Sequence, residues 1–163
     1  MPVYHILSKI APETREMPNV PLFSPVFPYI PLATEICNQW LLLDAGVSED
    51  DDILTGLYEK GWLQFDMEHE SYSLHPVFAK FIYEKYKPGA EAHHGLIKAC
   101  QKYLEIPESG SAMECQKYIP FAEDIAEKID MGENIEQVQF MNSLAFLLYY
   151  IGEYKKAEGL FKK

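Results

Sequence analysis

Apolar residues recur at helical spacing between residues 32 and 60 and predict two helices there. The first begins at Leu32, with Thr34 or Pro31 suited to open it, and its apolar stripe is Leu32, Ile36, Trp40 and Leu43. The second begins at Ser48, whose side chain can cap it, and ends near Gly61, where a C-cap glycine would lie. Its apolar face is Ile53, Leu54 and Leu57.

The pattern of residues 62–74 predicts a β-hairpin. Strands over 62–66 and 71–74 flank a polar tip at 67–70, so that Trp62 or Leu63 pairs near Leu74. His75 ends the second strand, and Pro76 suits the first position of a following helix. The apolar stripe of that helix is Val77, Phe78, Phe81, Ile82 and Tyr86, and residues 87–89 end it.

The chain beyond Gly89 is predicted to be helical throughout. Helices are expected over about 90–105, 111–130, 135–150 and 154–163, with short breaks at 107–110, 131–132 and 151–152. Upstream, residues 1–31 hold seven of the eleven prolines, which forbids a long helix there. Five apolar residues of that segment are expected to anchor it to the core: Val20, Leu22, Phe23, Val26 and Phe27.

Composition narrows the classes of function. The chain has 163 residues with 14 Lys+Arg and 25 Asp+Glu, a net charge of −11, which disfavours binding to nucleic acid or to anionic membranes. No apolar run approaches the roughly 20 residues of a membrane-spanning helix, and no signal pattern opens the chain. Cys37, Cys100 and Cys115 lack metal-like spacing, so we expect a cytoplasmic protein with reduced thiols and no metal.

The first half of the chain carries a set of familiar positions. They are Phe27-Pro28-x-Ile30-Pro31, Trp40, Leu54-x-x-Leu57-x-x-x-Gly61-Trp62-Leu63 and Tyr72-x-Leu74-His75-Pro76-Val77. With the order helix, helix, two-stranded wing, helix, they resemble the winged-helix segment that follows the nucleotide-binding domain in signal-transduction ATPases with numerous domains (STAND ATPases of the NB-ARC type). The resemblance covers roughly residues 20–87.

The resemblance implies a role for His75. In these ATPases a Met-His-Asp histidine at the strand-to-helix junction contacts the β-phosphate of ADP, and here the triplet reads Leu74-His75-Pro76, without the acidic third position. The alternative role of His75 is to cap the helix that Pro76 begins. Because the chain has no G-x-x-x-x-G-K-S/T motif, no cofactor is expected on it alone; ATP or ADP would belong to a full-length protein whose ATPase core precedes Met1.

In the last thirty residues, large, small, glycine and aromatic residues recur at the spacing found in a second known family. The matching residues are Leu144, Ala145, Leu148, Gly152, Tyr154, Ala157 and Phe161. This segment resembles a tetratricopeptide (TPR) repeat, and because one repeat cannot bury its own apolar face, we expect it to be the truncated start of a longer array. Nearby Tyr149, Tyr150, Tyr154 and Phe161 are interpreted as the packing seam with a next repeat, with a peptide-binding groove as the alternative.

Other candidate sites have simpler interpretations. Adjacent His93 and His94 cannot share a metal ion on a helix and are expected at the solvent or the rim. A solvated face, and not acid–base catalysis, is expected for Glu123, Asp124, Glu127 and Asp130 beside Lys128. The candidate DNA-reading helix, residues 48–60, holds five carboxylates and one lysine, and the wing tip adds Asp66, Glu68 and Glu70. Phosphate would repel all of them.

The sequence therefore predicts a mostly α protein with four segments. They are a proline-rich segment (1–19), a winged-helix domain (20–88), a helical hairpin (89–133) and a truncated TPR repeat (134–163). The expected function is a non-enzymatic regulatory segment that couples nucleotide state to a TPR sensor array. Its partners would be proteins or peptides and the upstream nucleotide-binding domain. The alternative is an acidic winged-helix transcriptional regulator with a helical effector domain.

Overall fold

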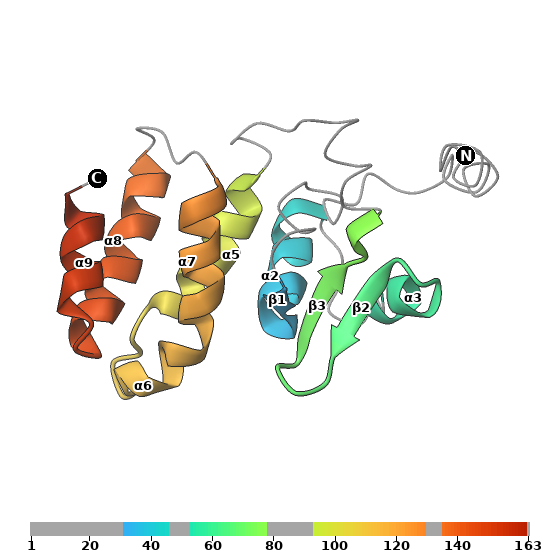
Figure 1. Cartoon of the computed structure of the whole chain (residues 1–163), viewed down its shortest axis with the longest axis horizontal. Coiled ribbons are helices and arrows are strands. Elements are labelled where there is room, and N and C mark those ends of the chain that lie inside the picture. Colours follow the sequence, from blue (N-terminus) through green and yellow to red (C-terminus); the bar gives the residue numbers. More distant parts are fainter. Residues whose placement is uncertain (1–30, 46–52, 78–92, 130–134, 163) are drawn as a thin grey trace.

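A small antiparallel sheet stands at one end of a mostly helical molecule (Figure 1). The computed structural model describes residues 31–45, 53–77, 93–129 and 135–162. Its strands are β1 (Leu32–Ala33), β2 (Leu63–Asp66) and β3 (Ser71–Leu74), in the spatial order β1-β3-β2. Two helices lie between β1 and β2 in the sequence, α2 (Thr34–Ala45) and α3 (Ile53–Glu59).

The remaining helices lie beyond α2, on the side away from β2. They are α5 (His94–Leu104), α6 (Ala112–Cys115), the 3-10 turn η4 (Gln116–Tyr118), α7 (Ile119–Lys128), α8 (Ile135–Tyr150) and α9 (Tyr154–Phe161). Helix α2 packs on α5, α5 packs on α7 and α8, and α8 packs on α9. Figure 1 shows this succession from the sheet to the C-terminal end of the molecule.

The predicted hairpin is confirmed, with Leu63 opposite Leu74 as expected. The third strand, β1, was not predicted. It pairs Leu32 with Tyr72 and Ala33 with Ser71, so the sheet has three strands and the first helix begins at Thr34 instead of Leu32. A strand of two residues is too short to show a period of two, and the burial of Leu32 fits a helical stripe equally well.

The C-terminal end of α3 confirms the expected role of Gly61. Its φ is +72°, a left-handed conformation that glycine adopts without a Cβ penalty. The amide of Gly61 donates to the carbonyl of Tyr58 at 2.9 Å, and that of Trp62 donates to the carbonyl of Leu57 at 3.0 Å. These two bonds form a Schellman motif, which turns the chain directly into β2.

The first helical stripe was wrong at Leu43, which is 44% exposed. The buried positions of α2 are Ile36, Cys37, Trp40 and Leu41. At 100° per residue, Leu43 lies about 90° from the centre of that face, and so at its margin.

The helix predicted over 111–130 is broken in the structure. Ser111 caps α6 with a reciprocal capping box, accepting from the amide of Met113 while its own amide donates to Glu114. After the four residues of α6 the chain tightens into η4 at Gln116, and α7 begins at Ile119. Pro120 explains the break, because it has no amide hydrogen and its ring would clash with the carbonyl four residues earlier in a continuous helix.

A single apolar core runs through all these elements. It continues from Leu32 in β1, through Trp40 and Cys100, to Ala157 in α9. It therefore crosses the segment boundaries proposed from the sequence, near residues 88 and 133. Several expectations fall outside the described residues: the anchoring residues of 1–31, the Ser48 cap, the helix after residue 77 and the 131–132 break. Of that helix, residues 76–77 are helical, and Val77 is exposed.

Candidate interaction surface

Helix α8 carries large apolar residues on two opposite faces. One face lies in the core through Phe140, Leu144, Leu147 and Leu148. The opposite face also carries large apolar residues, each about half exposed or more: Ile135, Val138, Phe146, Tyr149 and Tyr150. Polar Gln139 and Asn142 are exposed on the same face. A group of large apolar side chains exposed on one helix is nevertheless suited to a partner.

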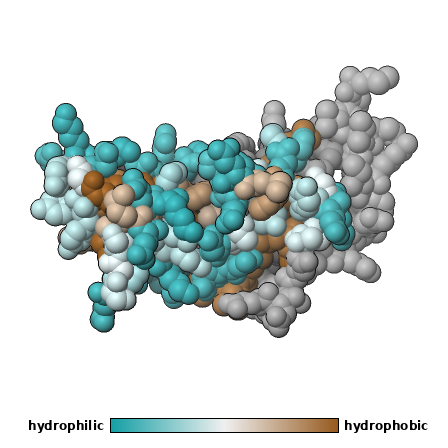
Figure 2. Space-filling model, turned by 90° about the horizontal axis from the view of Figure 1, so that it is seen from below, coloured by the Kyte–Doolittle hydropathy of each residue, from teal (hydrophilic) through white to brown (hydrophobic). Residues whose placement is uncertain are grey.

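Helix α9 extends this exposed face with two further rings. Tyr154 stacks edge-on against Tyr149 with ring centroids 5.3 Å apart, and Phe161 does the same against Phe146 at 5.4 Å. We call Phe146, Tyr149, Tyr150, Tyr154 and Phe161 the aromatic surface. In the view from below, the mainly hydrophilic surface is interrupted by hydrophobic patches, one of them at the end formed by α8 and α9 (Figure 2).

Small residues bring α8 and α9 close together behind the aromatic surface. Ala145 and Ala157 are almost completely buried. The turn between the helices is a second Schellman motif: Gly152 has a φ of +91° and donates to the carbonyl of Tyr149, while Glu153 donates to that of Leu148.

The seven TPR-like residues therefore divide into three groups. Four are buried between the helices: Leu144, Ala145, Leu148 and Ala157. Gly152 makes the turn, and Tyr154 and Phe161 are 62% and 49% exposed. The last two have their rings at the surface, where only α8 contacts them among the described ring pairs.

Charged residues on the neighbouring helices are paired with one another. Lys156 of α9 binds Glu123 of α7 at 2.7 Å, and this hydrogen bond raises the pKa of the Lys156 ammonium. Lys128 binds Asp124 at 3.3 Å on α7 itself. Glu123 therefore links α7 to α9, whereas Asp124 pairs within its own helix.

His75 lies half-buried where β3 ends. Its amide donates to the carbonyl of Trp62 at 3.1 Å. Its ring Nδ1 lies 3.4 Å from the amide of Val77, which donates to it at the start of the following helix. This contact corresponds to the capping role considered from the sequence. It leaves Nδ1 as an acceptor, so any proton on the neutral ring is on Nε2.

The two adjacent histidines were expected together at the solvent or rim, and this was wrong for His93. His93 is buried, whereas His94 is exposed and its Nδ1 lies 2.5 Å from Glu136 at the start of α8. Within the described ranges, no group of three or more His, Cys, Asp or Glu could hold a metal ion. The spacing of adjacent residues around a helix separates them, but it does not say which one faces the core.

The three cysteines are free thiols, as expected. Burial raises the pKa of Cys100 to about 12, and it also raises those of Cys37 and Cys115. A thiol reacts as its thiolate, so these side chains are inert packing groups. In the part of the chain that the structure describes, no helix has both the length and the apolar character needed to cross a membrane.

Comparisons with known proteins add no family. No family model, no curated protein and no solved structure matches this chain.

Proposed function

We propose that this chain is a non-catalytic regulatory and protein-interaction segment, and that its aromatic surface binds another helical protein surface. The observation that carries the proposal is the exposed apolar face of α8, extended by the rings of α9. Aromatic residues clustered on a rigid surface are the side chains that most often dominate binding energy in protein interfaces. They also lose little conformational freedom when a partner covers them.

The resemblance to STAND ATPases extends the proposal to the role of this segment in a full-length protein. In a full-length protein, this segment would couple the nucleotide state of an upstream ATPase domain to a TPR sensor array in the cytoplasm. The succession of α2, α3, β2 and β3 is the helix–helix–wing order on which the winged-helix resemblance rests. The close α8–α9 pair, with its buried alanines and glycine turn, supports the TPR half of the proposal.

His75 keeps two proposed roles within this scheme. Its contact with Val77 supports a structural cap in this chain. The side chain also has a second ring nitrogen, Nε2, which could donate to an ADP phosphate in the full-length protein. ATP and ADP thus belong to the proposal only for the full-length protein.

The alternative function is an acidic winged-helix transcriptional regulator. Against it, the hairpin 62–74 carries no lysine or arginine, and Asp66, Glu68 and Glu70 are exposed at its tip. A hairpin of this charge would repel the phosphates of a duplex.

A random peptide library displayed on phage, selected against the intact chain, tests the interaction proposal. We expect enriched peptides whose binding falls at least about tenfold in the double variant Phe146→Ser/Tyr150→Ser, as is typical of aromatic hot spots. The matched control is Tyr58→Ser/Met67→Ser, which removes two exposed apolar side chains from α3 and the hairpin tip. The control should bind the peptides as tightly as the wild-type chain.

Two outcomes would contradict this proposal. One is a selection in which every enriched peptide binds the double variant unchanged. The other is salt-sensitive binding of duplex DNA at micromolar concentration in a fluorescence-anisotropy titration, which would favour the transcriptional regulator.

A further inference from the structure

The first turn of α2 makes contact with the tip of the hairpin. The carbonyl oxygen of Glu70, in the turn before β3, accepts two hydrogen bonds from Thr34: one from its amide at 3.0 Å and one from its hydroxyl at 2.7 Å. Glu70 has a left-handed φ of +45°, and in this conformation its carbonyl meets the start of α2. The hairpin turn is thereby attached to one particular residue of the helix.

The next residue, Glu35, reaches in the other direction, toward the helical part of the molecule. Its carboxylate binds Lys117 of η4 at 3.1 Å, and its backbone carbonyl accepts a hydrogen bond from the hydroxyl of Tyr103 in α5 at 3.3 Å. Tyr103 in turn packs on Tyr118 with ring centroids 4.8 Å apart, and Lys117 lies over the ring of Tyr118. Two consecutive residues thus contact the hairpin turn, α5 and η4.

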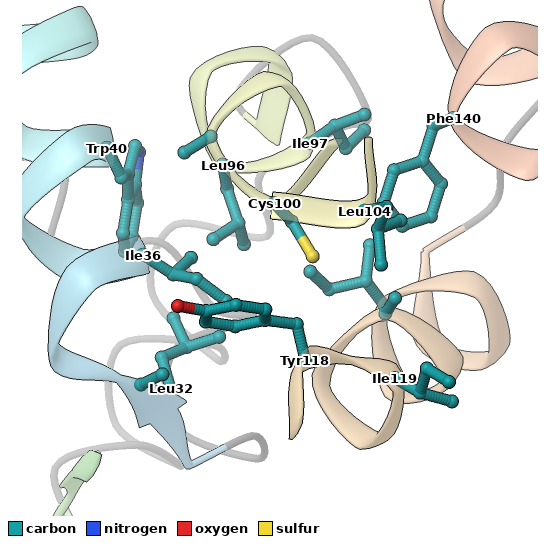
Figure 3. Close-up of a cluster of buried hydrophobic side chains, with 14 of the residues drawn as sticks. Leu32, Ile36, Trp40, Leu96, Ile97, Cys100, Leu104, Tyr118, Ile119 and Phe140 are labelled. Carbon is teal, nitrogen blue, oxygen red and sulfur yellow. The ribbon is translucent and has the colours of Figure 1, made fainter. Parts of the chain in front are cut away.

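The same turn of α2 also contacts the buried apolar core. Figure 3 shows the ring of Tyr118 reaching from η4 toward Leu32 and Ile36, with Cys100 of α5 beside it. Tyr118, Leu32, Ile36 and Cys100 are all buried. Because close-packed interiors shift as connected groups and not atom by atom, a displacement at the start of α2 would be felt at η4.

We propose that Thr34 and Glu35 form a coupling joint, through which the hairpin turn and the η4–α5 layer influence each other's stability. A change at the hairpin tip, such as the binding of a partner there, would alter the packing of η4 and α5. The effect is reciprocal, as any coupling free energy must be. The joint does not depend on what the aromatic surface binds.

A double-mutant cycle tests the joint. Thr34→Val removes the hydroxyl bond to Glu70, and Lys117→Met removes the ion pair to Glu35; both are mild changes in a chain that should still fold. The measured quantity is the unfolding equilibrium constant from urea titration of the intact chain. We expect the double variant to differ from the product of the two single effects by about threefold or more, within the range measured for residues of one hydrogen-bond network.

A matched cycle supplies the control. Lys156→Met removes the Lys156–Glu123 ion pair, whose two side chains are 54% and 37% exposed, close to the 61% and 37% of Lys117 and Glu35. Thr34→Val and Lys156→Met should combine without coupling, to within about twofold. Thr34→Ser keeps the hydroxyl, so Lys117→Met should change the unfolding equilibrium constant of this variant by the same factor as that of the wild-type chain. If Thr34→Val and Lys117→Met also combine within twofold, the joint does not exist.

Discussion

At the scale of single residues, Asp66 organises the tip of the hairpin. One carboxylate oxygen accepts from the amides of Glu68 and His69 at 2.9 and 3.3 Å, and the other lies 2.8 Å from the His69 ring. Hydrogen bonding to His69, followed by the bond from Glu68, lowers the pKa of Asp66. The hydrogen bond to Asp66 and its negative charge raise the pKa of His69.

These shifts predict how the turn depends on pH. Because the folded pKa of His69 is raised, its contribution is fully present below the ordinary histidine value of about 6.5 and is lost as pH rises through the folded value. The contribution of Asp66, whose pKa is lowered, is present above about pH 4 and is lost as pH falls. The pair should therefore support the turn best between about pH 4 and 6.5.

An NMR titration of the His69 ring checks this prediction. Asp66→Asn should bring the pKa of His69 down toward its ordinary value. Glu68→Gln, which removes the smaller electrostatic contribution, should lower it less. A His69 pKa that stays unchanged in Asp66→Asn would show that the ring and the carboxylate do not interact in solution.

At the scale of elements, the sequence predicted turns and caps better than it predicted burial. Gly61 and Gly152 end their helices as expected, because positive φ is a requirement of the local backbone. Leu43 and His93 were placed wrongly, because their exposure depends on which distant element packs against their helix. The sequence also failed to predict the break at η4. The apolar pattern there is helical, and the local effect of Pro120 on the backbone overrides it.

The two glycines of the last hairpin give an element-level prediction. Gly152→Ala forces a side chain into a left-handed conformation and should destabilise the chain by about 1–2 kcal/mol. Gly159→Ala, inside α9 with no atom near its new Cβ, should stabilise the chain by about 0.5–1 kcal/mol through helix propensity. Urea unfolding of both variants measures the difference. Equal effects of the same sign would contradict the Schellman turn at Gly152.

At the scale of the whole molecule, the sheet and the helices share one core. A segment boundary was predicted near residue 88, because the hairpin pattern gives way there to a purely helical one. In the structure, α2 packs on α5 through residues about sixty positions apart in the sequence. Periodicity describes one element at a time and carries no record of such long-range contacts. Four of the five residues of the aromatic surface were named from the sequence, as a packing seam with a next repeat or, alternatively, a peptide-binding groove. Phe146 was not named, because α8 carries apolar residues on both faces.

The shared core predicts a single cooperative unfolding transition. Both tryptophans, Trp40 and Trp62, belong to the sheet end, whereas α5 to α9 contribute most of the described helix. Tryptophan fluorescence and far-ultraviolet circular dichroism should therefore give the same urea midpoint and slope. A fluorescence transition clearly separated from the helical transition would mean that the two ends unfold independently.

The two apolar faces of α8 have a consequence for its tolerance of mutation. In a scan of all substitutions scored only for folding, the face with Phe140 and Leu144 should reject polar residues, while Phe146 and Tyr150 should accept them. Scored for the function of the protein in its cell, both faces should become intolerant if the proposed partner covers the second. The positions that differ between the two scans would trace the outline of the partner's footprint on the helix.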